Sequence, residues 1–358
     1  MKVASLSLKY FKKFHDQTFS FKDPETGDIN NLIVLYGDNA TGKSSILQSI
    51  AATLGVATGR LRRAGELEWP GFHLELANKS WQFPYEVALG IHFSKPELAA
   101  ACDYFSRVPD FAENPEALLP SQEQEVELSL VEGKVSAPSR GQYFQFRGRE
   151  YARKLVRQAP EGFDLFKHVG SVFWYNEFRG SSGLQVDEHD DRRMNFDENT
   201  LRRRLADWMY FHQRVIEGKY QLRPGQRDLY HDLEQAFKTL FPNHSFEGAV
   251  SRESGSEVPW FFLYDGQNQY EISEMSSGER AIIPLIFDFA FMNIHNSVIL
   301  IDEVEQHLNP ELQLALLNYL PRLGLNNQFF LTTHSDVIAD AVPEYSVIDL
   351  NELEASNG

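Results

Sequence analysis

The sequence Gly37-Asp-Asn-Ala-Thr-Gly-Lys-Ser44 constrains the fold of this chain more than any other segment. It follows an apolar run, 32–35, typical of a strand covered on both faces, and it precedes residues 45–52, which favour a helix. Two glycines at this spacing let backbone N–H groups curve around a phosphate, and the start of the helix adds partial positive charge. Lys43 would then pair with the β- and γ-phosphates of a nucleotide, and the Ser44 hydroxyl would bind Mg²⁺. A chance match in a glycine-containing turn is the weaker interpretation, because strand, loop and helix occur in the required order.

Composition indicates a folded protein and limits its partners. Of 358 residues, 42% are hydrophobic, which is enough for a packed core. No segment approaches the ~18 apolar residues of a membrane span, and the first residues lack the apolar region of a secretion signal. The single cysteine, Cys102, suits a reducing cytosol, so we expect a cytoplasmic protein with no membrane partner. The net charge of −17 argues against coating nucleic acid by charge alone, although a local basic patch remains compatible with it.

An apolar strand that ends in two carboxylates is the second motif. In Val298-Ile-Leu-Ile-Asp302-Glu303, Asp302 would hold Mg²⁺, and Glu303 would orient and deprotonate an attacking water. Solvated acids commonly end a strand, but a phosphate loop in the same chain makes that alternative weaker.

Three further segments complete an ordered set. Met275-Ser-Ser-Gly-Glu279 opens a helix with small residues, Glu305-Gln-His-Leu-Asn309-Pro310 follows the acidic strand, and Thr332-Thr-His334-Ser335 ends a later strand. A lone histidine after a strand is more often structural, but its place in this order favours a functional role. Together these segments resemble the signature loop, D-loop and switch histidine of ABC-type ATPase heads of the SMC/RecF class. That class includes single-chain ATPases of bacterial defence and DNA repair, and the opening hairpin with Leu6, Leu8, Phe11 and Phe14 resembles it too.

The resemblance implies a head-to-head homodimer with two ATP molecules in its interface. Ser276, Ser277 and Gly278 of one subunit would contact the γ-phosphate bound by Lys43 of the other. His334 would sense that phosphate, and Asn309, which replaces the usual acidic residue, would cross the dimer axis. The nucleotide-binding residues expected are Gly37, Asp38, Asn39, Ala40, Thr41, Gly42, Lys43, Ser44, Ser45, Ser276, Ser277, Gly278, Glu279 and Asn309. Glu303 and His334 are the expected catalytic residues, Ser44 and Asp302 the expected metal ligands, and Asn176 or Glu177 the expected Q-loop residue.

We therefore predict an α/β fold, an ABC-type P-loop NTPase head with a mainly parallel core sheet, an antiparallel β lobe and a short helical lid insertion. Period-two alternation between residues 82 and 147 predicts the antiparallel lobe, including a strand at 142–146. The predicted segments are an N-terminal ATPase lobe (1–180), a helical lid (181–265) and a C-terminal ATPase lobe (266–358). Within them we expect an exposed, partly helical acidic stretch (97–125), a loop (181–199) and two lid helices (199–216 and 226–241).

Charged clusters outside the motifs have simpler interpretations. The basic groups could touch nucleic acid, but solvated surface is favoured for each; they comprise Arg60, Arg62, Arg63, Arg147, Arg149, Arg153, Lys154, Arg157, Arg202, Arg203 and Arg204. Arg179, next to a strand end that should face the nucleotide, is a better candidate for a site residue than these groups. One loop carries five adjacent residues that could bind a metal: Asp187, Glu188, His189, Asp190 and Asp191. Adjacent acidic residues on one loop rarely converge on a single ion, so we expect a solvated loop there.

The leading functional hypothesis is an ATPase whose ATP-driven dimerisation gates a separately encoded effector, a nuclease or toxin, and anti-phage defence fits that description best. The chain ends about 24 residues after His334, so we expect it to lack the C-terminal nuclease domain of the overcoming-lysogenisation-defect family. A DNA-repair ATPase is the alternative. A transporter subunit is less favoured because 235 residues separate Lys43 from Gly278, and Glu303 argues against a nucleotide-locked scaffold.

Overall fold

The computed structural model describes residues 1–78, 83–108, 119–176, 198–223, 225–251 and 258–357. Its central sheet has five strands, and every neighbouring pair is parallel. The strands, in spatial order, are β13 (Val347–Asp349), β3 (Leu32–Tyr36), β12 (Gln328–Thr333), β11 (Val298–Ile301) and β7 (Val172–Tyr175). The predicted parallel core sheet is therefore confirmed.

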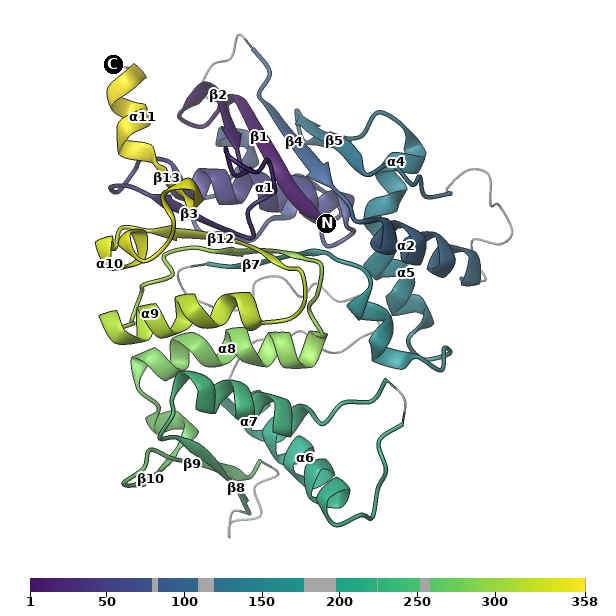
Figure 1. The fold of residues 1–358 in the computed structure, drawn as a ribbon, viewed down its shortest axis with the longest axis vertical. Helices are drawn as coiled ribbons and strands as arrows, with labels where there is room; N and C mark the ends of the chain where they lie inside the picture. The colour runs from purple at the N-terminus through teal and green to yellow at the C-terminus, as the bar shows by residue number, and fades with distance from the viewer. Residues whose placement is uncertain (79–82, 109–118, 177–197, 224, 252–257, 358) are drawn as a thin grey trace.

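Both faces of the central sheet are buried, which explains why its strands are apolar without interruption. Along β3, Ile33 and Leu35 join the core on one side, whereas Val34 joins the core on the other. On the first side lies α1 (Lys43–Ala57), whose Ile46, Leu47 and Ile50 are fully buried. On the opposite side lie α8 (Ser277–Met292) and α9 (Pro310–Tyr319) (Figure 1).

A second five-stranded sheet, antiparallel, covers the outer side of α1. Its strands are β2 (Phe14–Ser20), β1 (Lys2–Phe11), β4 (Glu86–His92), β5 (Glu125–Val131) and β6 (Lys134–Ser136), in that order. The predicted antiparallel lobe is present, but the strand predicted at 142–146 is wrong. Residues Arg140–Phe144 form α4, because the Ser139 hydroxyl accepts the Gln142 N–H at 3.2 Å and starts a helical turn.

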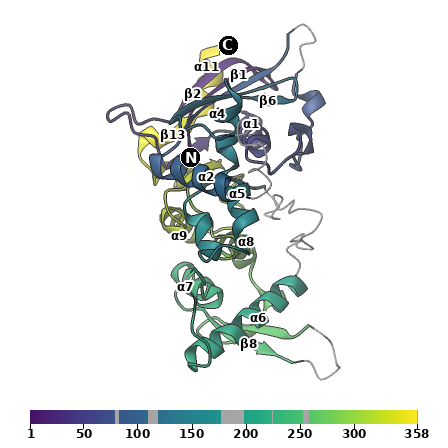
Figure 2. The same ribbon diagram turned by 90° about the vertical axis from the view of Figure 1, so that its right-hand side faces the viewer.

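The lid region contains two helices, α6 (Glu198–Ile216) and α7 (Leu229–Leu240), close to the predicted ranges. It also contains a three-stranded antiparallel sheet that the sequence did not reveal: β8 (Ser245–Val250), β9 (Trp260–Tyr264) and β10 (Gln269–Glu271). Leu205, Phe237 and Phe261 of this region share one hydrophobic core with Ile282 and Ile299 of the ATPase lobe. The lid is thus packed onto α8 at the end of the molecule away from the antiparallel sheet (Figures 1 and 2). The three proposed segment boundaries stay a prediction.

Two helices flank the sheets at one side, α2 (Lys95–Arg107) and α5 (Gly148–Leu155), and two short helices, α10 (Asp336–Asp340) and α11 (Leu350–Asn357), end the chain. The acidic stretch at 97–125 is partly helical as predicted, but it is not simply exposed. Leu98, Tyr104 and Phe105 of α2 are buried, and Tyr104 and Phe105 pack with Tyr151 of α5. Along the described residues, no helix is both long and apolar enough to cross a membrane.

Several basic residues are structural, so the solvated interpretation is wrong for them. The Arg60 guanidinium lies 4.6 Å from the centre of the Phe173 ring, and Arg149 lies 4.4 Å from that of Phe166 and donates to the Met292 carbonyl. Arg202 is buried and forms two hydrogen bonds, of 2.7 and 2.6 Å, with the Glu271 carboxylate. Other members of the set are exposed as expected, namely Arg62, Arg63, Lys154, Arg157 and Arg203. Arg179 and the acidic residues 187–191 lie outside the described residues.

Candidate active site

The loop 37–42 connects β3 to α1 with a geometry that requires glycine at its end. Gly42 has φ +100°, and a Cβ atom there would lie 2.7 Å from Cζ of Phe14. Thr41 is buried and closes the loop through its hydroxyl, which donates to the Asp38 carbonyl at 2.9 Å. Asp38, Asn39 and Ala40 are exposed at the tip. The loop therefore curves above the N-terminus of α1 as a phosphate-binding loop must.

Lys43, the first residue of α1, turns back over this loop. Its ammonium group donates to the carbonyls of Gly37 at 2.6 Å and Asp38 at 2.8 Å. Burial lowers the pKa of Lys43, whereas the carboxylates of Glu305 and Asp302 oppose that shift. The Lys43 side chain is thus held against the loop by two carbonyls, with the carboxylates of Asp302 and Glu305 nearby.

Asp302 follows the last residue of β11 and receives hydrogen bonds on both carboxylate oxygens. Its Oδ1 accepts from the Ser44 hydroxyl at 3.0 Å and from the Thr332 hydroxyl, and its Oδ2 accepts from the Trp69 indole N–H at 3.2 Å. Ser44 and Asp302 are 258 residues apart in sequence, and they meet because β11, β12 and β3 are parallel neighbours that end at the same edge.

The pair of Ser44 and Asp302 fits Mg²⁺ by donor chemistry. Hydroxyl and carboxylate oxygens are hard ligands, and Mg²⁺ typically uses one or two protein groups together with substrate phosphates. Within the described ranges, no group of three His, Cys, Asp or Glu side chains is placed to hold a metal alone. A cation at this place would depend on a bound phosphate for its remaining ligands.

Glu303 follows Asp302 directly and lines the pocket that contains Lys43 and Ser44. It has a left-handed backbone, φ +47°, and its N–H donates to the Thr332 hydroxyl at 2.8 Å. Left-handed backbone is uncommon for a residue with a side chain and is found often at functional sites. The same threonine hydroxyl therefore ties both acidic residues to β12.

His334 follows β12 and pairs with a carboxylate of the D-loop segment. Its backbone N–H donates to Oε1 of Glu305 at 2.7 Å, and its Nδ1 lies 2.8 Å from the same oxygen. The imidazole is 58% exposed, whereas Glu305 is buried. Glu305 thus holds the backbone and Nδ1 of His334, while more than half of the imidazole surface is open to solvent.

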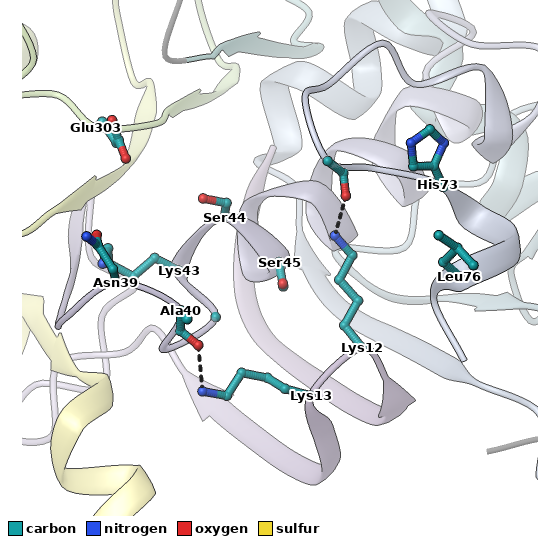
Figure 3. Close-up of a pocket in the computed structure, with 12 residues that line it drawn as sticks. Lys12, Lys13, Asn39, Ala40, Lys43, Ser44, Ser45, His73, Leu76 and Glu303 are labelled. Atoms are coloured by element: carbon teal, nitrogen blue, oxygen red, sulfur yellow. Dashed lines mark hydrogen bonds between the residues drawn. The ribbon is translucent and has the colours of Figure 1, made fainter. Parts of the chain in front are cut away.

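A pocket of about 420 Å³ joins the loop to residues that sequence reasoning missed. Lys12 and Lys13, from the turn between β1 and β2, and His73, after α1, line it together with Lys43 and Glu303 (Figure 3). Lys13 donates to the Ala40 carbonyl at 2.9 Å and Lys12 to the Gly71 carbonyl at 3.3 Å. The available signal was the pair of lysines at the tip of a predicted hairpin, but nothing in sequence spacing places that tip beside residue 40.

The signature residues lie at the start of α8. Ser276 is its N-cap and accepts the Glu279 N–H at 3.3 Å, while the Glu279 carboxylate accepts the Ser276 N–H and the Tyr270 hydroxyl. Ser276 and Ser277 are exposed, and Gly278 is buried where a Cβ atom would lie 2.9 Å from Leu312. None of residues 276–279 is among the described residues that line the pocket.

Of the remaining expected residues, Asn309 lies at the start of α9 and Asn176 at the end of β7. Asn309 is exposed and caps α9 by accepting the Leu312 N–H at 2.8 Å. Asn176 is buried directly after β7, next to the end of β11, whereas Glu177 lies outside the described residues. A Q-loop role for Asn176 remains a prediction.

Two family models match this chain. One, described as "AAA domain, putative AbiEii toxin, Type IV TA system", matches residues 123–340, and another, described as "AAA domain", matches residues 5–88. The ranges together contain every expected site residue from Gly37 to His334.

Two curated relatives carry the word ATPase in their names. Retron Vc95 probable ATPase of Vibrio cholerae serotype O1 biovar El Tor is 22% identical over an alignment 411 residues long, gaps included, that covers 99% of this chain and 74% of that protein. Retron Ec83 probable ATPase of Escherichia coli is 27% identical over 129 residues, covering 33% of this chain and 23% of that protein.

Among solved structures, the Smc head bound to the C-winged helix domain of ScpA has a TM-score of 0.51 at 16% identity, covering 95% of this chain and 91% of that one. At this identity the likeness concerns the fold alone. The predicted SMC-like P-loop head is confirmed.

Proposed function

Because this chain belongs to the AAA-domain family whose model matches residues 123–340, and is an ATPase with an SMC-like head, we propose that it hydrolyses ATP in the pocket beside Lys43. One observation carries the proposal. The Ser44 hydroxyl and the Asp302 carboxylate meet at 3.0 Å, and Glu303 faces the same pocket. A phosphate cradle, a pair of metal ligands and a candidate general base thus lie within one site.

The roles follow from chemistry and placement. Lys43, now bonded to the Gly37 and Asp38 carbonyls, would exchange these for β- and γ-phosphate oxygens, supported by the backbone N–H groups of the loop. Mg²⁺, held by Ser44 and Asp302, would neutralise charge on the phosphates. Glu303 would accept a proton from the attacking water, and the exposed side of His334 would contact the γ-phosphate.

We further propose that two subunits close around the nucleotide. Ser276 and Ser277 are exposed at a helix N-terminus, where partial positive charge favours a phosphate. They do not line the pocket of their own chain, so a second subunit would be needed to bring them to a nucleotide. The SMC-like fold supports this arrangement.

For the biological role, we propose that ATP-dependent dimerisation gates a separately encoded effector, a nuclease or toxin, in anti-phage defence in the cytoplasm. Support comes from the two relatives named as retron ATPases. A DNA-repair ATPase that acts directly on DNA is less favoured. Arg60, Arg149 and Arg202, which were candidates for contacts with DNA, are engaged in intramolecular contacts.

The experiment compares the wild type with Lys43→Ala. A fluorescent ATP analogue, phosphate release and molar mass by light scattering would be measured on the same preparations. We expect wild-type protein to hydrolyse ATP and to form a dimer of the 41.1 kDa chain when hydrolysis is blocked. Lys43→Ala should lose nucleotide affinity by about tenfold or more, the cost of a strong charge-assisted contact. Equal affinity in the two proteins would refute the assignment.

A further inference from the structure

Trp69 lies outside all the motifs, yet its indole N–H is directed at the metal-binding carboxylate. The Nε1 atom is 3.2 Å from Oδ2 of Asp302, although the two residues are 233 positions apart. Both are 5% exposed, so this bond is shielded from water. We propose that Trp69 is a positioning residue for Asp302, one that sets its orientation and thereby the affinity of the site for Mg²⁺. This inference rests on the proposed function, in which Asp302 holds that cation.

The distribution of donors on Asp302 explains why one indole matters. Ser44 and Thr332 both donate to Oδ1, whereas Trp69 donates to Oδ2. Removing the indole N–H would leave Oδ2 buried with a full share of negative charge and would free the carboxylate to rotate. Groups that orient metal ligands in this way typically change metal affinity by 10–100-fold.

The local sequence Trp69-Pro-Gly-Phe72 holds the indole in place. The Phe72 N–H donates to the Trp69 carbonyl at 3.0 Å, and Gly71 has φ +69°. Proline followed by a glycine with positive φ is the combination that a type II turn requires. Trp69 and Phe72 are both buried, so the turn is anchored at both ends.

The same turn contacts the two elements that flank the nucleotide pocket. The Gln48 side chain, from α1, donates to the Pro70 carbonyl at 3.2 Å. The Lys12 ammonium donates to the Gly71 carbonyl at 3.3 Å and lies 5.5 Å from the centre of the Phe72 ring. The position of the indole is thus fixed by the phosphate-loop helix and the hairpin together, and this would hold the Asp302 carboxylate ready before a cation arrives.

The first test measures Mg²⁺ dependence of nucleotide binding. The full chain would bind a fluorescent, non-hydrolysable ATP analogue in EDTA and in increasing MgCl₂. Trp69→Phe keeps an aromatic ring and removes the N–H. Trp208→Phe, on α6 in the lid, is the matched control, because Trp208 stacks on Phe287 of α8 and does not line the nucleotide pocket. We expect Trp69→Phe to raise the Mg²⁺ concentration at half-effect by about 10-fold to 100-fold, with affinity in EDTA changed by less than about threefold. A half-effect concentration equal to that of Trp208→Phe would overturn the inference.

A spectroscopic test follows the indole itself, in the chain that keeps Trp69. The chain has five tryptophans, so 5-fluorotryptophan labelling gives few ¹⁹F signals, and the signal lost in Trp69→Phe identifies Trp69. We expect the Trp69 signal of the otherwise unaltered chain to shift when MgCl₂ is added to the analogue complex, and to stay in place in Asp302→Asn. A Trp69 signal that does not move at saturating MgCl₂ would overturn the inference. Failure of the proposed function is distinguishable, because Lys43→Ala would then bind the analogue as tightly as wild type.

Discussion

Thr332→Val tests whether a single hydroxyl of β12 positions both Asp302 and Glu303. The Thr332 hydroxyl donates to Oδ1 of Asp302 and accepts the Glu303 N–H at 2.8 Å. Valine has nearly the same shape, so the substitution removes the hydroxyl and with it these two bonds. Thr332 is fully buried, and water cannot readily replace the hydroxyl.

The expected size of the effect follows from the bonds lost. A hydrogen bond to a carboxylate contributes about 1.5–3 kcal/mol, and each 1.36 kcal/mol corresponds to tenfold in rate. If the lost bonds support the geometry of Asp302 and Glu303 in the transition state, phosphate release should fall by roughly 10–100-fold. Binding of nucleotide in EDTA should change little, because Lys43 and the loop backbone are untouched.

Thr333→Val is the matched control for this experiment. Thr333 is also fully buried, but neighbouring residues of a strand point to opposite faces, and its hydroxyl accepts the Ser335 N–H at 3.0 Å. Steady-state phosphate release at saturating ATP and MgCl₂ would compare the two valine variants. Equal turnover in both would refute the reasoning that the Thr332 hydroxyl positions the acidic pair.

Two further predictions concern buried charge. Arg202→Met should destabilise the protein by about 3–5 kcal/mol in urea unfolding, because the buried Glu271 carboxylate would lose its partner. Burial would raise the pKa of Glu271, but hydrogen bonds from Arg202 and Ser273 lower it to about 2. Adding Glu271→Gln should recover most of the lost stability, and no recovery would contradict the pairing. Burial raises the pKa of Asp288 to about 7 although the Tyr175 hydroxyl and Arg60 oppose it, so folded protein keeps a proton that the unfolded chain loses near pH 4. The stability that this proton provides is present below about pH 4 and is lost as the pH rises to 7. Relative to Asp288→Asn, the wild type should therefore lose up to about 4 kcal/mol of unfolding free energy over that range. Parallel pH profiles of the two proteins in urea unfolding would contradict the assignment.

The parts of the fold that were predictable depend on local signals. The apolar run at 32–35, the glycines and Lys43 predict strand, loop and helix because each requirement lies within a few residues. Period-two alternation at 142–146 was misleading, since Ser139, a few residues upstream, starts a helical turn. The sheet β8–β10 was missed because its strands are short, the last of them only Gln269–Glu271.

The candidate site was only partly predictable, for a different reason. Its motif residues can be recognised by their order, but Trp69 and Lys12 reach the site through contacts across the fold, Trp69 with Asp302 and Lys12 with Gly71. Outside the site, the Arg149 guanidinium likewise meets a carbonyl 143 residues away, at Met292. Such contacts depend on how the sheets and helices pack, which the spacing of residues in the sequence does not specify.

Single-turnover phosphate release by Glu303→Gln tests the central claim most directly. The substitution keeps the size of the side chain and removes its ability to accept a proton, while leaving Lys43, Ser44 and Asp302 unchanged. If Glu303 is the general base of this pocket, phosphate release should slow by about 10²–10⁴-fold with ATP still bound. Release at the wild-type rate would contradict the account and would remove Glu303 from the mechanism.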